Sequence, residues 1–283
     1  MVDASDPTER ATQAVGVFDS GMGGLSVLQE IRALLPHESL VYVADAGCVP
    51  YGGRPADVIR ERSRALVTFF QELPVKAVVV ACNTATAAAA PELRGRWPEL
   101  PIIAMEPAVK PAVAMTRSGV IGVLATEGTL ASDRFSGLVS QYAGSVRVLT
   151  QPCPGLVERV EQGDTDSAEL DRLLLTYLTP LLNAGVDTLI LGCTHYPFLR
   201  ERIHAVAGRP LHLIETGPAV ARQLQRRLHR EGLLAPERTA RNTTFWTTGE
   251  PAALQAFLQR CWPHEPGQVS RLDPARLRHE ATF

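Results

Sequence analysis

The chain has 283 residues, a formal net charge of −2, 45% hydrophobic residues and 20% charged residues. These values exclude a disordered chain and a disulfide-stapled miniprotein, and the length predicts about two domains. No apolar run reaches the ~18 residues of a membrane-spanning helix, so no membrane association is expected. The near-zero charge gives no electrostatic reason to expect nucleic acid as a partner. Residues 1–14 lack the apolar core of a secretory signal, so we expect a solvated N-terminal extension on a cytoplasmic protein.

The predicted elements alternate between short β-branched strands and amphipathic helices. In chain order we expect a strand over 15–18, a helix over 25–35, a strand over 40–43, a helix over 58–72, a strand over 77–81, a helix over 85–90, strands over 102–104, 120–124 and 146–149, a helix over 168–184, strands over 188–191 and 211–214, a helix over 219–231 and a strand over 243–246. This alternation predicts an α/β fold with mostly parallel sheets flanked by helices. The polar residues 264–283 predict a partly ordered tail.

Cysteine and lysine usage narrows the possible chemistry. The five cysteines, at positions 48, 82, 153, 193 and 261, are widely spaced and form no C-x-x-C pair. This pattern favours reduced thiols over a disulfide framework or a zinc site, and we predict no metal. Lys76 and Lys110 are the only lysines. Their sequence contexts do not suit a Schiff base, which counts against a pyridoxal-phosphate enzyme.

A weak internal repeat indicates two similar lobes. The segment 16–21 resembles 122–128, and 78–84 resembles 189–195, in the same order and at nearly equal spacing. Both segments of the second pair contain a cysteine, Cys82 in 78–84 and Cys193 in 189–195, at the end of a strand and the start of a helix. Ligands of such folds bind beyond the carboxyl ends of the strands, so both cysteines are predicted at one cleft, on opposite walls. A helix N-terminus there favours the thiolate.

Other polar residues lie at predicted strand ends. Asp19 and Ser20 lead into the glycine-rich segment 21–24, which permits close approach of a ligand anion or forms an ordinary turn. His195 follows Cys193 by two residues and is a candidate partner of that thiol. Glu161 is either an assistant of Cys193 or a solvated charge at a helix end. The sequence therefore predicts a thiol-centred site with nearby acid/base groups.

Five sequence blocks resemble those of glutamate racemases, within the cofactor-independent aspartate/glutamate racemase family. They are Phe18-Asp-Ser-Gly-Met-Gly-Gly-Leu-Ser-Val27, Pro50-Tyr-Gly52, Ala81-Cys-Asn-Thr-Ala-Thr-Ala87, Gly192-Cys-Thr-His-Tyr-Pro197 and Phe245-Trp-Thr-Thr-Gly249. The matching blocks span about residues 15–250. Relatives that act on aspartate usually carry a glutamate in place of the histidine in the fourth block, so His195 favours glutamate as the substrate.

The resemblance implies an isomerase without a cofactor that interconverts L- and D-glutamate, supplies D-glutamate for peptidoglycan, and is a homodimer. It implies catalytic roles for Cys82, Cys193, Asp19, His195 and Glu161. It implies that the substrate is bound or oriented by Asp19, Ser20, Pro50, Tyr51, Gly52, Asn83, Thr84, Thr126, Thr129, Thr194 and His195. With the repeat, it places 1–104 and 215–283 in a first α/β lobe and 105–214 in a second, related by pseudo-twofold symmetry with the active site between them.

Three other functions compete with this interpretation. Two reactive cysteines across a cleft also suit a thiol–disulfide oxidoreductase, although the chain has no C-x-x-C. A two-lobed, non-catalytic amino-acid sensor is a second alternative, and it leaves both thiols unexplained. A racemase for aspartate or for a broader set of amino acids is the third, because one methylene changes pocket affinity by only ~1–3 kcal/mol.

Overall fold

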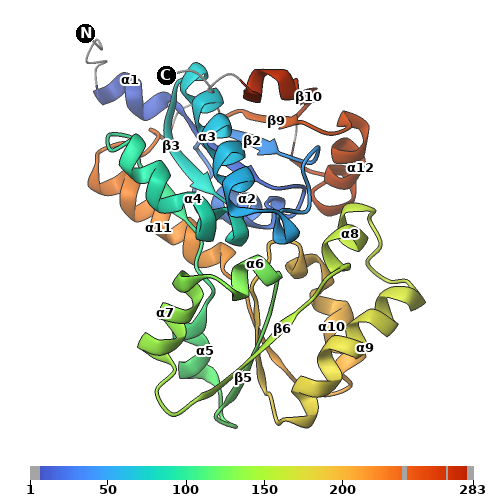
Figure 1. Ribbon diagram of the computed structural model, residues 1–283. Helices are drawn as coiled ribbons and strands as arrows, with labels where there is room; N and C mark the ends of the chain where they lie inside the picture. The colour runs from blue at the N-terminus through green and yellow to red at the C-terminus, as the bar shows by residue number, and fades with distance from the viewer. Residues whose placement is uncertain (1–6, 238–240, 266, 279–283) are drawn as a thin grey trace.

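Two parallel sheets organise the fold (Figure 1). The computed structural model describes residues 7–237, 241–265 and 267–278. Within these ranges, one sheet has six strands in the order β10-β9-β2-β1-β3-β4 and the other has four in the order β6-β5-β7-β8. Helices flank both sheets. The predicted α/β class with two sheet-based lobes is confirmed, and we call the halves the six-stranded lobe and the four-stranded lobe.

The six-stranded lobe is assembled from both ends of the chain. Its strands are β1 (Ala14–Asp19), β2 (Leu40–Ala44), β3 (Val75–Val80), β4 (Ile102–Ala104), β9 (Thr243–Thr247) and β10 (Val269–Arg271). Its helices are α1 (Pro7–Thr12), α2 (Leu25–Leu34), η1 (Tyr51–Gly53), α3 (Ala56–Glu72), α4 (Asn83–Arg96), α11 (Gly217–Arg230), α12 (Pro251–Cys261) and η3 (Pro274–Arg278).

The four-stranded lobe is formed by the middle of the chain. Its strands are β5 (Val120–Ala125), β6 (Arg147–Pro152), β7 (Thr188–Leu191) and β8 (His212–Ile214). Its helices are α5 (Val109–Met115), α6 (Glu127–Leu130), α7 (Asp133–Tyr142), α8 (Leu156–Glu161), α9 (Ala168–Asn183), η2 (Tyr196–Leu199) and α10 (Arg200–Ala207). The chain thus crosses between lobes after β4 and again after β8, and the residue boundaries given above for the lobes stay a prediction.

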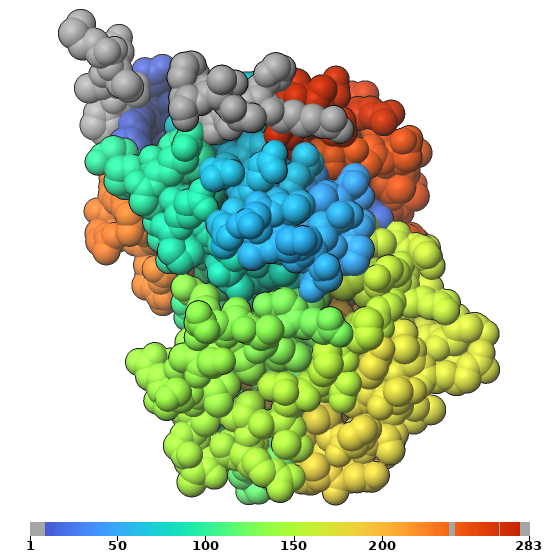
Figure 2. All heavy atoms as spheres, viewed as in Figure 1, coloured from blue at the N-terminus to red at the C-terminus, as the bar shows by residue number. Residues whose placement is uncertain are grey.

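The central strands are buried because their side chains are apolar on both faces of the sheet. Every residue of β3 is buried, as expected for a parallel sheet covered by helices. On one face Val79 packs in a cluster that includes residues of α2 and α11. On the other face Val78 and Val80 pack with residues of α3 and α4. The two lobes touch along one boundary (Figure 2). Cys82, just after β3, and Cys193, just after β7, lie together at this boundary.

Both terminal predictions need correction. Residues 7–12 form α1 instead of a solvated extension; Ala11 is buried, and its carbonyl accepts a hydrogen bond from Lys76 Nζ at 2.6 Å. Residues 267–278 include β10 and η3 instead of a partly ordered tail, because β10 covers the edge of β9 and Leu272 packs in the core. Residues 1–6, 266 and 279–283 of these two predictions lie outside the described residues. None of the described helices is both long and apolar enough to span a bilayer.

Candidate active site

The first predicted thiol begins helix α4. Cys82 follows β3, and its Sγ accepts a hydrogen bond from Ala85 N at 3.4 Å as the helix N-cap. The thiol donates to Ser20 Oγ at 3.8 Å. Burial, followed by the charge of Asp19, raises the pKa of Cys82 far above its ordinary value, and the Ala85 N–H offsets this only in part. The prediction of a favoured thiolate is therefore wrong at Cys82, because desolvation outweighs the helix N-terminus.

Ser20 links this thiol to a buried carboxylate. Ser20 Oγ donates to Asp19 Oδ1 at 3.4 Å. The second carboxylate oxygen, Oδ2, accepts from Gly24 N at 2.6 Å and from Thr194 Oγ1 at 3.2 Å, so Asp19 also contacts the four-stranded lobe. Burial raises the pKa of Asp19, although the nearby His195 lowers it. Asp19 is therefore linked to Cys82 through the Ser20 hydroxyl.

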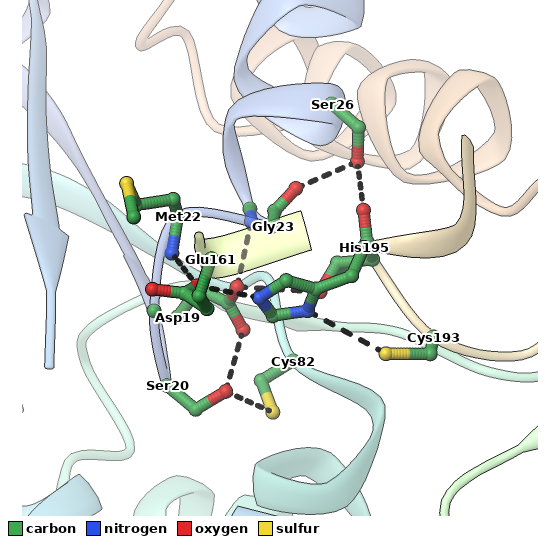
Figure 3. A network of polar contacts seen from close by, with 12 residues as sticks. Asp19, Ser20, Met22, Gly23, Ser26, Cys82, Glu161, Cys193 and His195 are labelled. Carbon is green, nitrogen blue, oxygen red and sulfur yellow. Dashed lines mark hydrogen bonds and ion pairs between the residues drawn. The ribbon is translucent and has the colours of Figure 1, made fainter. Parts of the chain in front are cut away.

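The second thiol has a direct acid/base partner (Figure 3). Cys193 follows β7, and its Sγ lies 3.6 Å from His195 Nδ1. The other ring nitrogen, Nε2, lies 2.6 Å from Glu161 Oε1. Burial alone would lower the pKa of His195, but its hydrogen bonds to Cys193 and Glu161 raise the pKa well above the ordinary value. Cys193, His195 and Glu161 thus form a hydrogen-bonded chain that can accept and hold the thiol proton.

One small cavity contains both thiols. Most of the predicted site residues line it, namely Ser20, Pro50, Tyr51, Gly52, Cys82, Asn83, Thr84, Thr126, Cys193, Thr194 and His195. Asp19, Thr129 and Glu161 lie behind this wall and contact it through Ser20, Thr84 and His195, respectively. The wall also includes Val157 and Gly192, which the sequence did not single out. Gly192 begins one of the five matching blocks but was given no role, and Val157 has no polar side chain that would mark it.

Threonine hydroxyls meet across the boundary between the lobes. Thr84 Oγ1, at the start of α4, lies 2.9 Å from Thr126 Oγ1 and 3.3 Å from Thr129 Oγ1 of the four-stranded lobe. Beside them, neither amide atom of the buried Asn83 side chain, Oδ1 or Nδ2, has a hydrogen-bond partner in the described part of the chain. Because unpaired buried polar atoms are rare and costly, Asn83 is equipped to bind a polar ligand in the cavity.

A buried ionic cluster supports the η1 wall of the cavity. The Tyr51 hydroxyl donates to Asp45 Oδ2 at 2.6 Å, and the Thr248 hydroxyl donates to Asp45 Oδ1 at 2.7 Å. Arg62 forms an ion pair with the same carboxylate. Arg62 is not among the residues predicted from the sequence, and Thr248 lies in a matching block that carried no predicted role for it. Their function depends on contacts between β2, α3 and β9 that local patterns do not reveal.

Other cavities and charged clusters lie apart from the thiols. Among the residues that the structure describes, no group of three or more His, Cys, Asp or Glu side chains is arranged to hold a metal ion. A larger hollow of about 430 Å³ lies between β4, α7 and α11 and is lined by Arg94, Arg134 and Arg227, but it contains neither Cys82 nor Cys193. The two thiols and the unpaired amide make the smaller cavity the candidate active site.

The fold and the cavity define a class of protein: a two-lobed α/β enzyme whose site lies at the strand ends of two parallel sheets. The chain belongs to the Asp/Glu/Hydantoin racemase family, whose pattern matches residues 20–239. It is therefore an isomerase of the racemase type.

Individual relatives agree with this assignment. A glutamate racemase of Pseudomonas putida (strain W619) is 56% identical over 258 residues, which cover 91% of this chain and 97% of the relative. The crystal structure of glutamate racemase isoform RacE1 from Bacillus anthracis is similar with a TM-score of 0.83 and 34% identity, covering 92% of this chain and 97% of that one. A glutamate racemase from Francisella tularensis, solved in complex with D-glutamate, has a TM-score of 0.81 and 26% identity and covers 93% and 98%.

Proposed function

We propose that this protein interconverts L- and D-glutamate, with Cys82 and Cys193 as the two acid/base residues. The observation that carries the proposal is that two buried thiols, one from each lobe, line a single small cavity. Racemisation needs a base on one face of the α-carbon and an acid on the other. The names of the relatives support glutamate as the substrate.

In one direction, Cys193 removes the α-proton. Glu161 accepts a hydrogen bond from His195 Nε2–H. The other ring nitrogen, Nδ1, then carries a lone pair that points toward Cys193 Sγ. For the reaction, His195 accepts the thiol proton and leaves Cys193 as the attacking thiolate. The thiolate then takes the α-proton of one enantiomer, and the protonated Cys82, whose raised pKa keeps it a thiol, donates a proton to the opposite face.

In the other direction, Cys82 must first lose its proton. Its thiol donates to Ser20 Oγ, which in turn donates to Asp19 Oδ1. A proton can pass along these two hydrogen bonds to Asp19, whose raised pKa makes it a stronger base than an exposed aspartate. His195 returns its proton to Cys193 Sγ. The Cys82 thiolate then removes the α-proton, and the Cys193 thiol supplies the new one.

The cavity must also stabilise the negative charge that develops at the α-carbon. Asn83 Nδ2 has no partner among the described residues and can donate to the α-carboxylate, while Asn83 Oδ1 can accept from the α-ammonium group. Thr84 and Thr126 supply hydroxyls at the same wall. Burial of these groups excludes water and strengthens each of their interactions with the substrate.

The proposed physiological setting follows from the activity and from the cysteines. All five cysteines are free thiols, which suits a reducing cytoplasm. D-glutamate made there would serve peptidoglycan synthesis, and we propose a homodimer, as the family resemblance implies. The experiment below addresses the reaction itself.

Serine substitution of each thiol is the direct test. We expect Cys82→Ser and Cys193→Ser each to lower racemisation by about 10²- to 10⁴-fold, because a serine hydroxyl is a far weaker acid and base than a thiol. Glutamate binding, measured by calorimetry, should remain detectable. Conversion of each enantiomer is followed by chiral chromatography, and α-proton exchange by NMR in deuterated water.

Cys261→Ser is the matched control, because Cys261 ends α12 and does not line the cavity. It should retain full activity. Full racemisation by either cavity variant would contradict the two-thiol reaction. Faster conversion of aspartate than of glutamate by the unaltered protein would contradict the proposed substrate.

A further inference from the structure

The glycine loop, Gly21–Gly24, carries the six-stranded lobe into contact with the acid/base chain of Cys193. It follows β1 and precedes α2. The loop is anchored within its own lobe at both ends: Tyr42 OH donates to Gly21 O at 2.7 Å, and Gly24 N donates to Asp19 Oδ2 at 2.6 Å. These two hydrogen bonds hold the backbone between them in a defined position.

The middle of the loop donates directly to Glu161. Met22 N lies 2.6 Å from Glu161 Oε1, the same oxygen that lies 2.6 Å from His195 Nε2 (Figure 3). Glu161 and His195 belong to the four-stranded lobe, whereas Met22 belongs to the six-stranded lobe. Among the described residues, Glu161 therefore has one hydrogen-bond partner in each lobe.

The loop approaches so closely that a side chain at either of two glycine positions would displace Glu161 or His195. A Cβ atom at Gly21 would lie 2.2 Å from Glu161 Oε1, and one at Gly23 would lie 2.4 Å from His195 Nδ1. Neither glycine has a positive φ, so the requirement is for space and not for an unusual backbone conformation. Ser26 Oγ adds a further contact between the lobes, at 2.9 Å from Thr194 O.

We propose that the glycine loop is the positioning element of the Glu161–His195 pair, so that Cys193 gains its acid/base partner only when the lobes are together. This inference rests on the proposed function and adds how one of its two thiols is controlled. The Met22 N–H holds Glu161 Oε1 in place, and this oxygen accepts the hydrogen bond from His195 Nε2–H. The His195 ring is thereby oriented with Nδ1 toward Cys193 Sγ. When the lobes separate, Glu161 loses one of its two partners and the imidazole is no longer fixed.

Cys82 depends on the loop and on the other lobe only indirectly, through Gly24 N and Thr194 Oγ1, which both donate to Asp19 Oδ2. Its partners Ser20 and Asp19 belong to its own lobe, so their hydrogen bonds to Cys82 and to each other do not require the four-stranded lobe. Disturbing the loop at Gly21 should therefore impair Cys193 much more than Cys82. A general loss of structure would instead impair both thiols to a similar extent.

A one-way reaction separates the two thiols. With 3-chloroglutamate, a thiolate removes the α-proton, the electron pair of that bond forms a Cα–Cβ double bond, and chloride leaves. Each α-enantiomer then reports one thiol, and Cys82→Ser and Cys193→Ser show which enantiomer each thiol serves. In Gly21→Ala we expect chloride release from the Cys193-dependent enantiomer to fall by about 100-fold, with less than a threefold change for the other.

A second readout follows His195 itself. The groups that face its imidazole are Glu161, Cys193 and, through its charge, Asp19. Because the bond to Glu161 helps raise the pKa of His195, we expect NMR titration to show a lower His195 pKa in Gly21→Ala than in the unaltered protein. The resonance is assigned by comparison with His195→Gln.

Gly95→Ala is the control, since a Cβ there would meet no atom within 4 Å; it should change neither readout. Gly23→Ala, whose methyl would displace the imidazole directly, repeats the test if Gly21→Ala does not fold. Equal losses for both enantiomers, or an unchanged His195 titration, would overturn the proposal. If the unaltered protein neither racemises glutamate nor releases chloride, the proposed function fails and the His195 titration alone decides the positioning role.

Discussion

Asn83 shows at the scale of one residue how function costs stability. It is the first residue of α4, its side chain is buried, and both of its amide atoms lack partners. A buried polar atom without a partner costs about 1–3 kcal/mol. The free protein therefore tolerates an unfavourable side chain that a bound amino acid would satisfy.

We predict opposite effects of Asn83→Leu on stability and on binding. The substitution is close to isosteric and removes two unpaired polar atoms, so the free energy of unfolding should rise by about 1 kcal/mol. The KM for both glutamate enantiomers should rise by about 10- to 100-fold, because a hydrogen bond to a charged group is lost. Chemical denaturation and steady-state kinetics measure the two effects.

Asn183→Leu is the matched substitution at an exposed position at the end of α9. It should leave KM unchanged and alter stability little. A destabilised Asn83→Leu protein with normal KM would contradict the role assigned to this side chain.

At the scale of elements, the short strand β10 matters more than its polar sequence indicates. It pairs in parallel with β9 at the edge of the six-stranded sheet. Directly after it, Leu272 is fully buried, and it packs in the same core cluster as Phe69 and Phe70 of α3. Residues 269–272 thus cover the edge of β9 and complete one face of the core.

We predict that Leu272→Ala lowers the free energy of unfolding by about 2–5 kcal/mol, because it leaves a cavity in a packed core. Urea denaturation followed by circular dichroism measures the change. Leu175→Ala, at a leucine of α9 that is 46% exposed, is the control and should cost less than about 0.5 kcal/mol. Equal costs for the two substitutions would show that β10 and its neighbours are dispensable.

For the whole molecule, we predict that the contact between the lobes governs access to the site. The cavity between the thiols leaves only about 10 Å³ for the centres of water-sized molecules, roughly the space of a single water. We therefore predict that the proposed substrate enters while the lobes are further apart and reacts when they are together. Contacts between the lobes that lie away from the cavity set the balance between these states.

One such contact is an aromatic pair. Phe198 of η2 and Phe257 of α12 are edge-to-face, with ring centroids 5.1 Å apart. Such a pair stabilises the contact by about 0.5–1.5 kcal/mol in addition to the free energy gained by burying the surface of the rings. We predict that Phe257→Leu lowers the closed population and raises KM for both enantiomers by about 2- to 10-fold, as steady-state kinetics will measure.

The matched control lies within one lobe. Phe69 and Trp246 are also edge-to-face, with centroids 5.6 Å apart, and both belong to the six-stranded lobe. Phe69→Leu should lower stability without raising KM. A similar rise in KM for both variants would mean that KM reports general loosening and not lobe closure.

Local patterns in the sequence were sufficient for the α/β fold and for the two thiols. The strands predicted at 102–104 and 188–191 agree with β4 and β7 residue for residue, because short apolar runs between turn residues define buried parallel strands. Cys82 and Cys193 follow such strands, so their place at the carboxyl ends was predictable. The short elements α1 and β10 were missed, since packing and not local periodicity stabilises them.

The amino-acid sequence by itself determined which chemistry is present: two thiols in matched settings, a histidine beside one and an aspartate before a glycine loop near the other. Only the tertiary structure decided how these groups act. Met22 donates to Glu161 across 139 positions of sequence, and burial reverses the expected pKa shift of Cys82. Hydrogen bonds between distant segments and desolvation both depend on which surfaces meet, and no local pattern of residues encodes that.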